Sequence, residues 1–463
     1  MFMSYGRRVI YSDATEITRK NVVEEVTKAA MIHAGNRNDI QRLYDIYTGK
    51  TAILNKTKET REAINHKICE NRAFEVVSFY LGYIFGEPIQ YVRREDSDSQ
   101  KDDDSIAGGV NRLNTHMVSS GKAAVDKDLG KWILIGGNGY RLCLPNKRWT
   151  LNGDESPFKQ QSLDPRQTFI VYHSGIEKYP LMSVYVVERE NHERIFSGYT
   201  DKYYFEFTEF DGKLKWQPHA LGMNPIIEYT AESRLGVFEV VVDLLDALNE
   251  LQSNRMDDIV QFVNSFLAIL GGQLDEETYQ KLEEWKTLCL PEGVDAKYLV
   301  ASLNQTDVQT MKDDLYQSIL TITGVPNRNG GSSTSDNGVA VIYRDGFVTA
   351  ESRSKIFETG FKEADRNFLR LALRILRDTE DTALKLDDIE AHFTRRNYEN
   401  IANKSQVLTT MLNNPKIHPE LAFQACGMFP DPEAAYLQSM AYYDEQMEKW
   451  EVTEVNEGDD VDV

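Results

Sequence analysis

The feature of this 463-residue chain that most constrains its fold is an apolar stripe between residues 237 and 270. Apolar side chains recur there at intervals of three and four residues, as on one face of an α-helix. The stripe predicts a helix over Val237–Leu270, about 45 Å long. The centre of this helix, Asn249–Asp258, is almost wholly polar. We therefore expect a helix that stands partly free or packs beside copies of itself, because a helix buried in a core would be apolar there.

A small excursion and a second helix follow this long helix. Residues 271–305 predict a helix (Asp275–Leu288), a turn and a strand near Tyr298–Leu303. A second helix, Asp307–Thr323, has its own apolar stripe and ends at Gly324 and Pro326. The next segment, Asn327–Gly338, consists of small polar residues, which predicts a flexible loop.

A third long helix is predicted over Val339–Leu376, with a kink at Asp345-Gly346. A strand, Ile389–Thr394, and short helices from Asn403 to Trp450 come next. The final acidic residues predict a disordered tail.

The first half of the chain mixes helices with strands. Helices are predicted at 13–33, Thr60–Phe85 and 110–135, a strand at Ile89–Arg93, and an acidic loop at Arg94–Ser105. From about Gly139 to Gln217 the sequence pattern predicts strands. The last two of these strands are joined by the turn Asp211-Gly212. The expected strands are Tyr140–Leu144, Phe169–His173, Leu181–Arg189, Tyr203–Phe210 and Lys213–Gln217.

Charge, cysteine usage and hydropathy exclude several classes of protein. A net charge of −21 argues against wrapping nucleic acid, which needs clustered cations, but not against a surface past which DNA slides. Four scattered cysteines predict a reduced protein without a disulfide framework or zinc site. The most apolar run, Ala73–Phe85, is shorter than a membrane span, and the N-terminus lacks a signal-peptide pattern. We expect no membrane partner.

No sequence motif predicts an enzyme. Gly49-Lys50-Thr51 resembles the end of a phosphate-binding loop, but Tyr44 stands where that motif needs glycine. The histidines show no metal-binding spacing. We therefore predict no catalysis and no cofactor.

One alternative uses the acidic residues of the long helix. Asp243, Asp246, Asp257 and Asp258, with Glu250 between them, could hold Mg²⁺ for a metal-dependent nuclease or another DNA-packaging enzyme. The residues lie in mid-helix without a histidine or lysine partner nearby in sequence, so a solvated or subunit-facing surface is the preferred interpretation.

The order of elements resembles the portal proteins of tailed bacteriophages, especially siphophages of Gram-positive hosts. Several segments are similar to that family in amino-acid sequence as well as in order. They are Tyr44–Leu54, Asn71–Tyr91, Leu221–Glu228, Gly236–Gly271, Gly324–Pro326 and Val339–Gly346.

The resemblance implies an α+β fold with named parts. It implies an N-terminal arm (1–39), an α/β wing (40–236), two stem helices (237–270 and 307–323) and a small α/β clip between them (271–306). It further implies a tunnel loop (324–338), a kinked long helix with the strand that returns to the wing (339–400), a helical crown (401–450) and an acidic tail (451–463).

The resemblance also implies a function as a head–tail connector. Twelve subunits would form a ring at one capsid vertex, through which double-stranded DNA is packaged and ejected without sequence preference. Partners would be the large terminase subunit, a head–tail adaptor, and the major capsid and scaffold proteins. The protein would lie in the virion, and in the host cytoplasm during assembly. The tunnel-loop residues facing DNA would be Arg328, Asn329, Ser332, Ser333, Thr334, Ser335, Asp336 and Asn337.

A scaffold-like interaction protein, acidic and helical, is a further alternative. The loop of small polar residues between two helices favours the portal, because a scaffold has no use for such a loop.

Overall fold

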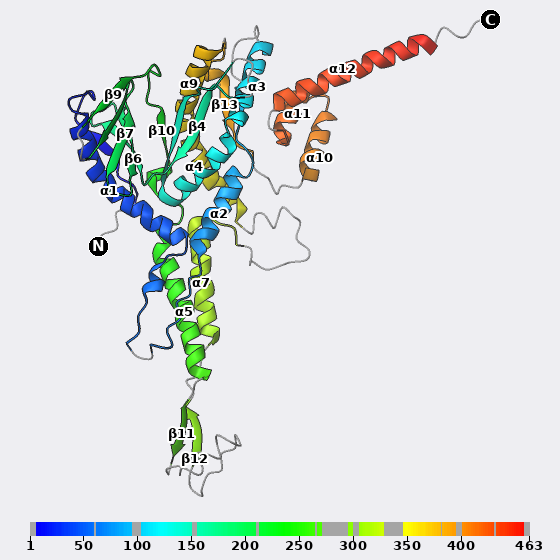
Figure 1. Ribbon diagram of the computed structural model, residues 1–463. Helices are drawn as coiled ribbons and strands as arrows, with labels where there is room; N and C mark the ends of the chain where they lie inside the picture. The colour runs from blue at the N-terminus through cyan, green and yellow to red at the C-terminus, as the bar shows by residue number, and fades with distance from the viewer. Residues whose placement is uncertain are drawn as a thin grey trace. The chain divides into compact units, whose positions relative to one another are not determined.

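The computed structural model divides into two compact units, each with elements from distant parts of the sequence (Figure 1). Unit 1 comprises Met1–Leu43, Val77–Glu239 and Gly324–Val463, and unit 2 comprises Tyr44–Val76 and Val240–Thr323. The fold class is α+β, as predicted. The structure describes residues 6–59, 62–94, 103–150, 155–209, 213–263, 266–270, 295–299, 305–327, 346–380, 382–394, 401–429 and 432–457.

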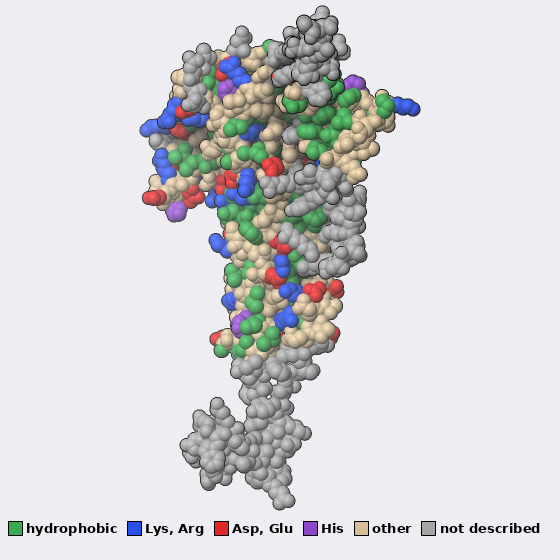
Figure 2. All heavy atoms as spheres, turned by 90° about the vertical axis from the view of Figure 1, so that its right-hand side faces the viewer, with side chains coloured by type: hydrophobic (Ala, Val, Ile, Leu, Met, Phe, Trp, Pro, Cys, Tyr) green, Lys and Arg blue, Asp and Glu red, His purple; other side chains and the backbone are tan. Residues whose placement is uncertain are grey.

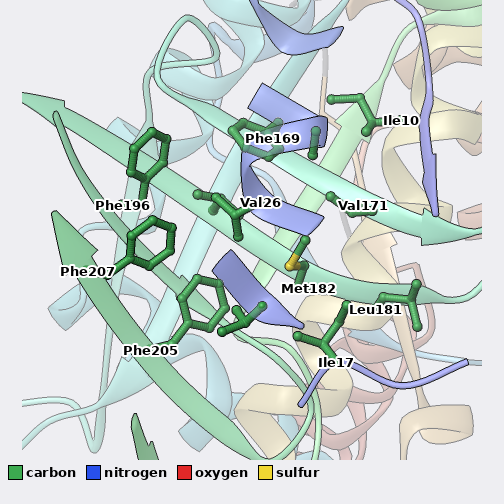
Figure 3. Close-up of a cluster of buried hydrophobic side chains, with 13 residues drawn as sticks. Ile10, Ile17, Val26, Phe169, Val171, Leu181, Met182, Phe196, Phe205 and Phe207 are labelled. Atoms are coloured by element: carbon green, nitrogen blue, oxygen red, sulfur yellow. The ribbon is translucent and has the colours of Figure 1, made fainter. Parts of the chain in front are cut away.

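The largest sheet of unit 1 has six strands and is covered on one face by helix α1 (Val22–Tyr47). Its order is β1-β5-β6-β7-β8-β9, with β1 parallel to β5 and all other neighbours antiparallel. Val22, Val26 and Ala29 lie on one side of α1 and pack onto the sheet, where Phe169, Phe196, Phe205 and Phe207 fill the core (Figure 3). The strands are β1 (Ile10–Ser12), β5 (Thr168–His173), β6 (Pro180–Glu188), β7 (Arg194–Tyr199), β8 (Tyr203–Thr208) and β9 (Lys215–Pro218).

A second sheet of unit 1 has the order β10-β3-β4 and carries two helices. The strands are β10 (Ile226–Thr230), β3 (Asn138–Pro145) and β4 (Phe158–Leu163), and the helices are α4 (Lys122–Gly136) and α9 (Phe347–Thr379). Gly137 ends α4 with φ +78°, and a Cβ there would lie 2.1 Å from the carbonyl oxygen of Arg234. Only glycine fits this sharp entry into β3.

The remaining elements of unit 1 complete its body. Helix α3 (Asp103–Ser119) contacts β2 (Gln90–Arg93), which pairs antiparallel with β13 (Ile389–His392). Three C-terminal helices pack in sequence: α10 (Ile401–Leu412), α11 (Pro419–Cys426) and α12 (Pro432–Glu457).

Unit 2 is built on a helical hairpin of α5 (Val242–Val263) and α7 (Gln305–Thr323) (Figure 1). Strand β11 (Phe266–Leu270) follows α5 and pairs antiparallel with β12 (Asp295–Leu299), which precedes α7. The unit also contains the single turn Ala52–Asn55 and the start of α2 (Arg72–Phe85). No helix among the described residues is long and apolar enough to cross a membrane.

Most predicted elements are present. All five predicted strands from Tyr140 to Gln217 exist, and β8 and β9 pair as a hairpin. The prediction missed β1, β4, β7 and β10, and it joined α3 and α4 into one helix. Helix α7 and its left-handed end at Gly324 (φ +74°) are confirmed. Asp275–Leu288 lies outside the described residues, as do the turn residues Asp211-Gly212.

Four helix predictions were wrong. The helix predicted over 13–33 is α1, which begins only at Val22 and continues to Tyr47. The helix over Val237–Leu270 ends at Val263, and Phe266–Leu270 is a strand, because this apolar run has a partner strand in Asp295–Leu299. The helix over Thr60–Phe85 begins only at Arg72. No kinked helix passes through Gly346, because this residue is left-handed (φ +87°) and α9 begins after it. Residues 339–345, which that prediction included, lie outside the described part of the chain.

The acidic tail was predicted from residue 451, but α12 continues to Glu457.

Candidate functional site: the helical pair and the ends of segment 328–345

The polar centre of α5 is explained by an extended segment that lies along it. Asn249, Ser253 and Asp257 are buried although polar. Their side-chain oxygens accept hydrogen bonds from the backbone N–H groups of Glu70 (2.8 Å), Ile68 (2.9 Å) and His66 (2.7 Å), respectively. We call these three hydrogen bonds the polar ladder.

The polar ladder can form because the spacing of side chains along α5 matches the spacing of N–H groups along the extended segment. Four residues of an α-helix advance about 6.0 Å along its axis, and two residues of an extended chain advance about 6.6 Å. Every fourth side chain of α5 therefore meets every second N–H of residues 66–70. The same N–H groups could not also serve a helix, so residues 65–71 are not helical, although a helix was predicted there.

Among the three side chains that α5 contributes to the polar ladder, Asp257 is the one that carries a charge. Its side chain is fully buried, and its carboxylate accepts hydrogen bonds from Lys56 (3.1 Å), Lys58 (2.5 Å) and the ring of His66 (2.8 Å). Burial by itself raises the pKa of Asp257, but the hydrogen bonds from Lys58, His66 and Lys56 outweigh it and hold that pKa well below its ordinary value. Asp257 is therefore an anion held by cations of its own chain.

This environment overturns the predicted acidic face. Asp243 and Asp258 are exposed, Asp246 is half-buried, and Asp257 is buried on another side of the helix. Consecutive helical residues point about 100° apart, so Asp257 and Asp258 cannot share one ion. Within the described residues, no group of three or more His, Cys, Asp or Glu side chains could hold a metal. The nuclease alternative is not supported.

Glu70 ties the extended segment to both helices of the hairpin. Its carboxylate accepts a hydrogen bond from Gln252 of α5 (3.1 Å) and pairs with Lys312 of α7 (3.6 Å). Next to it, the guanidinium of Arg72 lies 4.1 Å from the ring centre of Tyr316, whose hydroxyl donates to Glu75 (2.9 Å). The helical pair is therefore cross-linked by polar side chains along much of its length.

The far end of the hairpin is also held by polar contacts. Arg255 of α5 donates to the side-chain oxygens of Gln305 and Gln309 of α7, each at 2.8 Å. Apolar side chains such as Met256, Ile259 and Met311 remain exposed on the same two helices. Figure 2 shows side chains of both charge signs interspersed with apolar ones over the helical pair.

Within unit 1, the two ends of segment 328–345 lie close together. A Cβ placed on Gly346 would lie 3.8 Å from the Cα of Pro326, so the chain leaves and returns at nearly the same point. A side chain at Gly324 would lie 2.6 Å from Cδ of Arg353 and 3.0 Å from the hydroxyl oxygen of Tyr80, at φ +74°. The predicted site residues, from Arg328 to Asn337, lie outside the described residues.

Helix α9, which begins where this segment ends, is fixed to the second sheet by a cluster of buried charges. Asp365 accepts hydrogen bonds from the hydroxyls of Tyr91 (2.7 Å) and Tyr229 (2.8 Å) and pairs with Arg141 (3.3 Å). Arg141 also binds Asp126, which binds Lys122. Lys122, Asp126, Arg141 and Asp365 form what we call the buried charge cluster.

The buried charge cluster is balanced and sealed by aromatic rings. Two carboxylates face two cations, and all four side chains are almost fully buried. Burial raises the pKa of Tyr91 and of Tyr229 well above the ordinary value, so both hydroxyls stay protonated and donate. The cluster gives α9, and hence one end of segment 328–345, a rigid base.

Sequence reasoning missed the partners of both networks. For the polar ladder a signal exists: Asn249, Ser253 and Asp257 recur every four residues on a helix whose other stripe is apolar. The partners Lys56, Lys58 and His66 carry no comparable signal. Nor does the sequence around Arg141 indicate that its charge is buried.

One of the comparisons with known proteins identifies a family. A family model described as "Phage portal protein, SPP1 Gp6-like" matches residues 29–457. No curated protein is matched by the sequence.

Solved structures with some likeness come from gene transfer agent particles. The neck of an empty particle matches with 16% sequence identity and a TM-score of 0.47, over 77% of this chain and 90% of that one. The neck of a native particle matches with 14% identity and a TM-score of 0.46, over 77% and 89% of the two chains. These likenesses are too low to carry an argument. The family model covers most of the chain, and on that ground the chain belongs to the SPP1 Gp6-like family of phage portal proteins.

Proposed function

We propose that the protein forms a ring of twelve copies at one vertex of a phage capsid, and that double-stranded DNA passes through the ring during packaging and ejection. Membership of the portal family is the observation that carries this proposal. Exposed apolar side chains on α5 and α7, among mixed charges, suit helices that pack beside neighbouring copies.

In this assignment, the parts of the chain have separate roles. Residues 40–236 and 339–400 form the wing, α5 and α7 the stem, 271–306 the clip, and 401–450 the crown. Residues 324–338 form the tunnel loop. The adjacent ends of segment 328–345 support this last role, because a loop with joined ends can project into a channel without disturbing its base.

The ring conducts DNA passively. Twelve copies of a subunit with net charge −21 carry about −250, a field that repels DNA and prevents sticking. No catalysis is assigned to the chain, so the force for packaging comes from the terminase motor, which docks on the clip. A head–tail adaptor replaces the motor, and the major capsid and scaffold proteins contact the wing and crown. Assembly takes place in the host cytoplasm.

Electron microscopy of the purified protein tests the ring. Twelvefold rings are expected, and a protein that stays monomeric under all assembly conditions would contradict the proposal. A hydrolysis assay with DNA or ATP and Mg²⁺ tests the passive role. Activity that disappears in Asp246→Ala would revive the nuclease alternative.

Deletion of Ser332–Asp336 tests the tunnel loop. We expect the variant to form rings, because the two ends of the segment already lie next to each other at Pro326 and Gly346. DNA packaging into heads should fall. Normal packaging by correctly assembled rings would refute the assignment of this loop.

A further inference from the structure

A cavity of about 830 Å³ in unit 1 follows the outer edge of β4 and the end of the β3–β4 hairpin. Residues of both faces of β4 line it. Gln160 points to the face where its amide donates to Ser120, the residue just after α3 (2.7 Å), whereas Lys159 and Gln161 stand opposite Leu144 and Leu142 in the strand register, on the other face. The cavity therefore runs along the strand edge and not over one face only.

The backbone of this edge is open to another strand. β4 is the last strand in the order β10-β3-β4, and no described residue pairs with its outer side. Every second residue of an antiparallel strand directs its N–H and C=O groups away from its one partner. Such an edge can accept an added strand through backbone hydrogen bonds.

Three cations gather at this edge. Lys147, Arg148 and Lys159 line the cavity, are exposed, and form no ion pair with any described residue. Glu155, the one acid of the lining, instead accepts a hydrogen bond from Asn146 (2.7 Å). In a chain with 73 acidic and 52 basic residues, such a group of unpaired cations favours an anionic partner.

A lysine on an edge strand can also serve to prevent unwanted pairing. Two observations argue for a ligand here. A protective lysine needs neither two further cations nor a cavity. In addition, Gln160 is only 9% exposed, and its side-chain oxygen accepts no hydrogen bond from the described residues. An incoming peptide brings further N–H donors to this edge.

We propose that the edge of β4 binds an extended peptide segment of a partner protein, in which acidic side chains alternate with small apolar or β-branched ones. The peptide backbone pairs with β4. Its acidic side chains meet Lys147 and Arg148 at the end of the hairpin. Its apolar side chains, which point to the opposite face of the added strand, meet Leu142, Leu144 and the aliphatic stem of Lys159, which share one face of the sheet.

Binding of a labelled nine-residue peptide, TEVETEVET, to the full-length protein tests the proposal by fluorescence anisotropy. The double variant Lys147→Glu and Arg148→Glu should bind it at least tenfold more weakly. The control is Arg19→Glu with Lys20→Glu, an adjacent pair of exposed cations that also form no ion pair with described residues. The control should bind like the wild type. No binding by the wild type, or equal loss in both variants, would overturn the proposal.

Two further measurements separate strand pairing from general attraction of anions. The backbone amides of residues 158–163 should exchange more slowly when the peptide is bound. A peptide with proline in place of each valine lacks N–H donors there and should bind at least tenfold more weakly. Unchanged amide exchange, or a short DNA duplex that binds as tightly and with the same dependence on Lys147 and Arg148, would show a simple anion site and would refute the proposed peptide.

Discussion

The buried charge cluster of unit 1 and the polar ladder of unit 2 both place charges inside the protein, by different means. In unit 1, Arg141 lies between two carboxylates and is sealed by aromatic rings, with the ring of Phe368 4.4 Å away. In unit 2, Asp257 is buried, but its partners Lys58 and His66 are 24% and 37% exposed. The charges of unit 1 are thus almost fully buried, whereas the cations that hold Asp257 in unit 2 are partly open to water. The two networks should respond differently to mutation, acid and salt.

The largest effect is expected from Arg141→Ala. The change leaves Asp126 and Asp365 in a buried site with Lys122 as their one remaining cation, and removal of one member of a buried ion pair costs about 3–5 kcal/mol. Hydrogen exchange of β3 and α9 as a function of denaturant measures the loss. The control is Arg366→Ala on the same α9, whose exposed pair with Asp387 (3.0 Å) should contribute less than about 1 kcal/mol. Equal effects of the two variants would contradict a special role for burial.

As the pH falls, unit 1 should lose stability before the polar ladder of unit 2 is affected. Burial lowers the pKa of His33 from 6.5 to about 4, and its ring packs 4.8 Å from that of Phe169. Between these two pH values the unfolded chain binds a proton that the folded unit excludes, so stability falls as the pH falls. The loss amounts to about 3 kcal/mol.

His33→Phe keeps an aromatic ring at this position and cannot titrate. Its stability should change less than that of the wild type between pH 6.5 and 4. Unfolding by urea at several pH values gives the comparison. Parallel curves for the two proteins would show that His33 does not control this range.

Asp257→Asn tests the ladder itself. The folded pKa of Asp257 is depressed, so its contribution is present at neutral pH and is lost only in stronger acid than affects His33. Loss of the charged acceptor should cost about 1–3 kcal/mol. The amides of His66, Ile68 and Glu70 should then exchange faster. Asp258→Asn, at an exposed position, should change stability by about 0.5 kcal/mol or less.

Lys58→Ala should have the smallest effect. Asp257 keeps Lys56 and His66, and Lys58 is partly exposed, so a loss of about 0.5–1 kcal/mol is expected. Added salt should make this loss of stability smaller still, because salt screens exposed charges. Hydrogen exchange of residues 66–70 at low and high salt measures this. A loss as large as that of Arg141→Ala would remove the contrast between the two units.

The sequence predicts what depends on local pattern and misses what depends on distant partners. Helix α7 and its end at Gly324 follow from an apolar stripe and a glycine, and the β8–β9 hairpin follows from two strands with a turn signal. Phe266–Leu270 suits a helix or a strand equally by composition, and only its pairing with residues 295–299 decides. In the same way, residues 66–70 are not helical because Asn249, Ser253 and Asp257, almost 180 residues or more away, bind their N–H groups. The predicted DNA-facing residues stay a prediction.

The neighbouring ends of segment 328–345 make it a natural position for grafting. When two anchor points already touch, the cost of closing the chain between them grows only with the logarithm of its length, about 0.6 kcal/mol for each doubling. Pro326 and Gly346 supply such anchor points. Related proteins could therefore differ widely in the length and chemistry of this segment while the underlying helices stay the same. An engineer could likewise exchange it for a reporter or a charged insert and expect the remainder of unit 1 to fold unchanged.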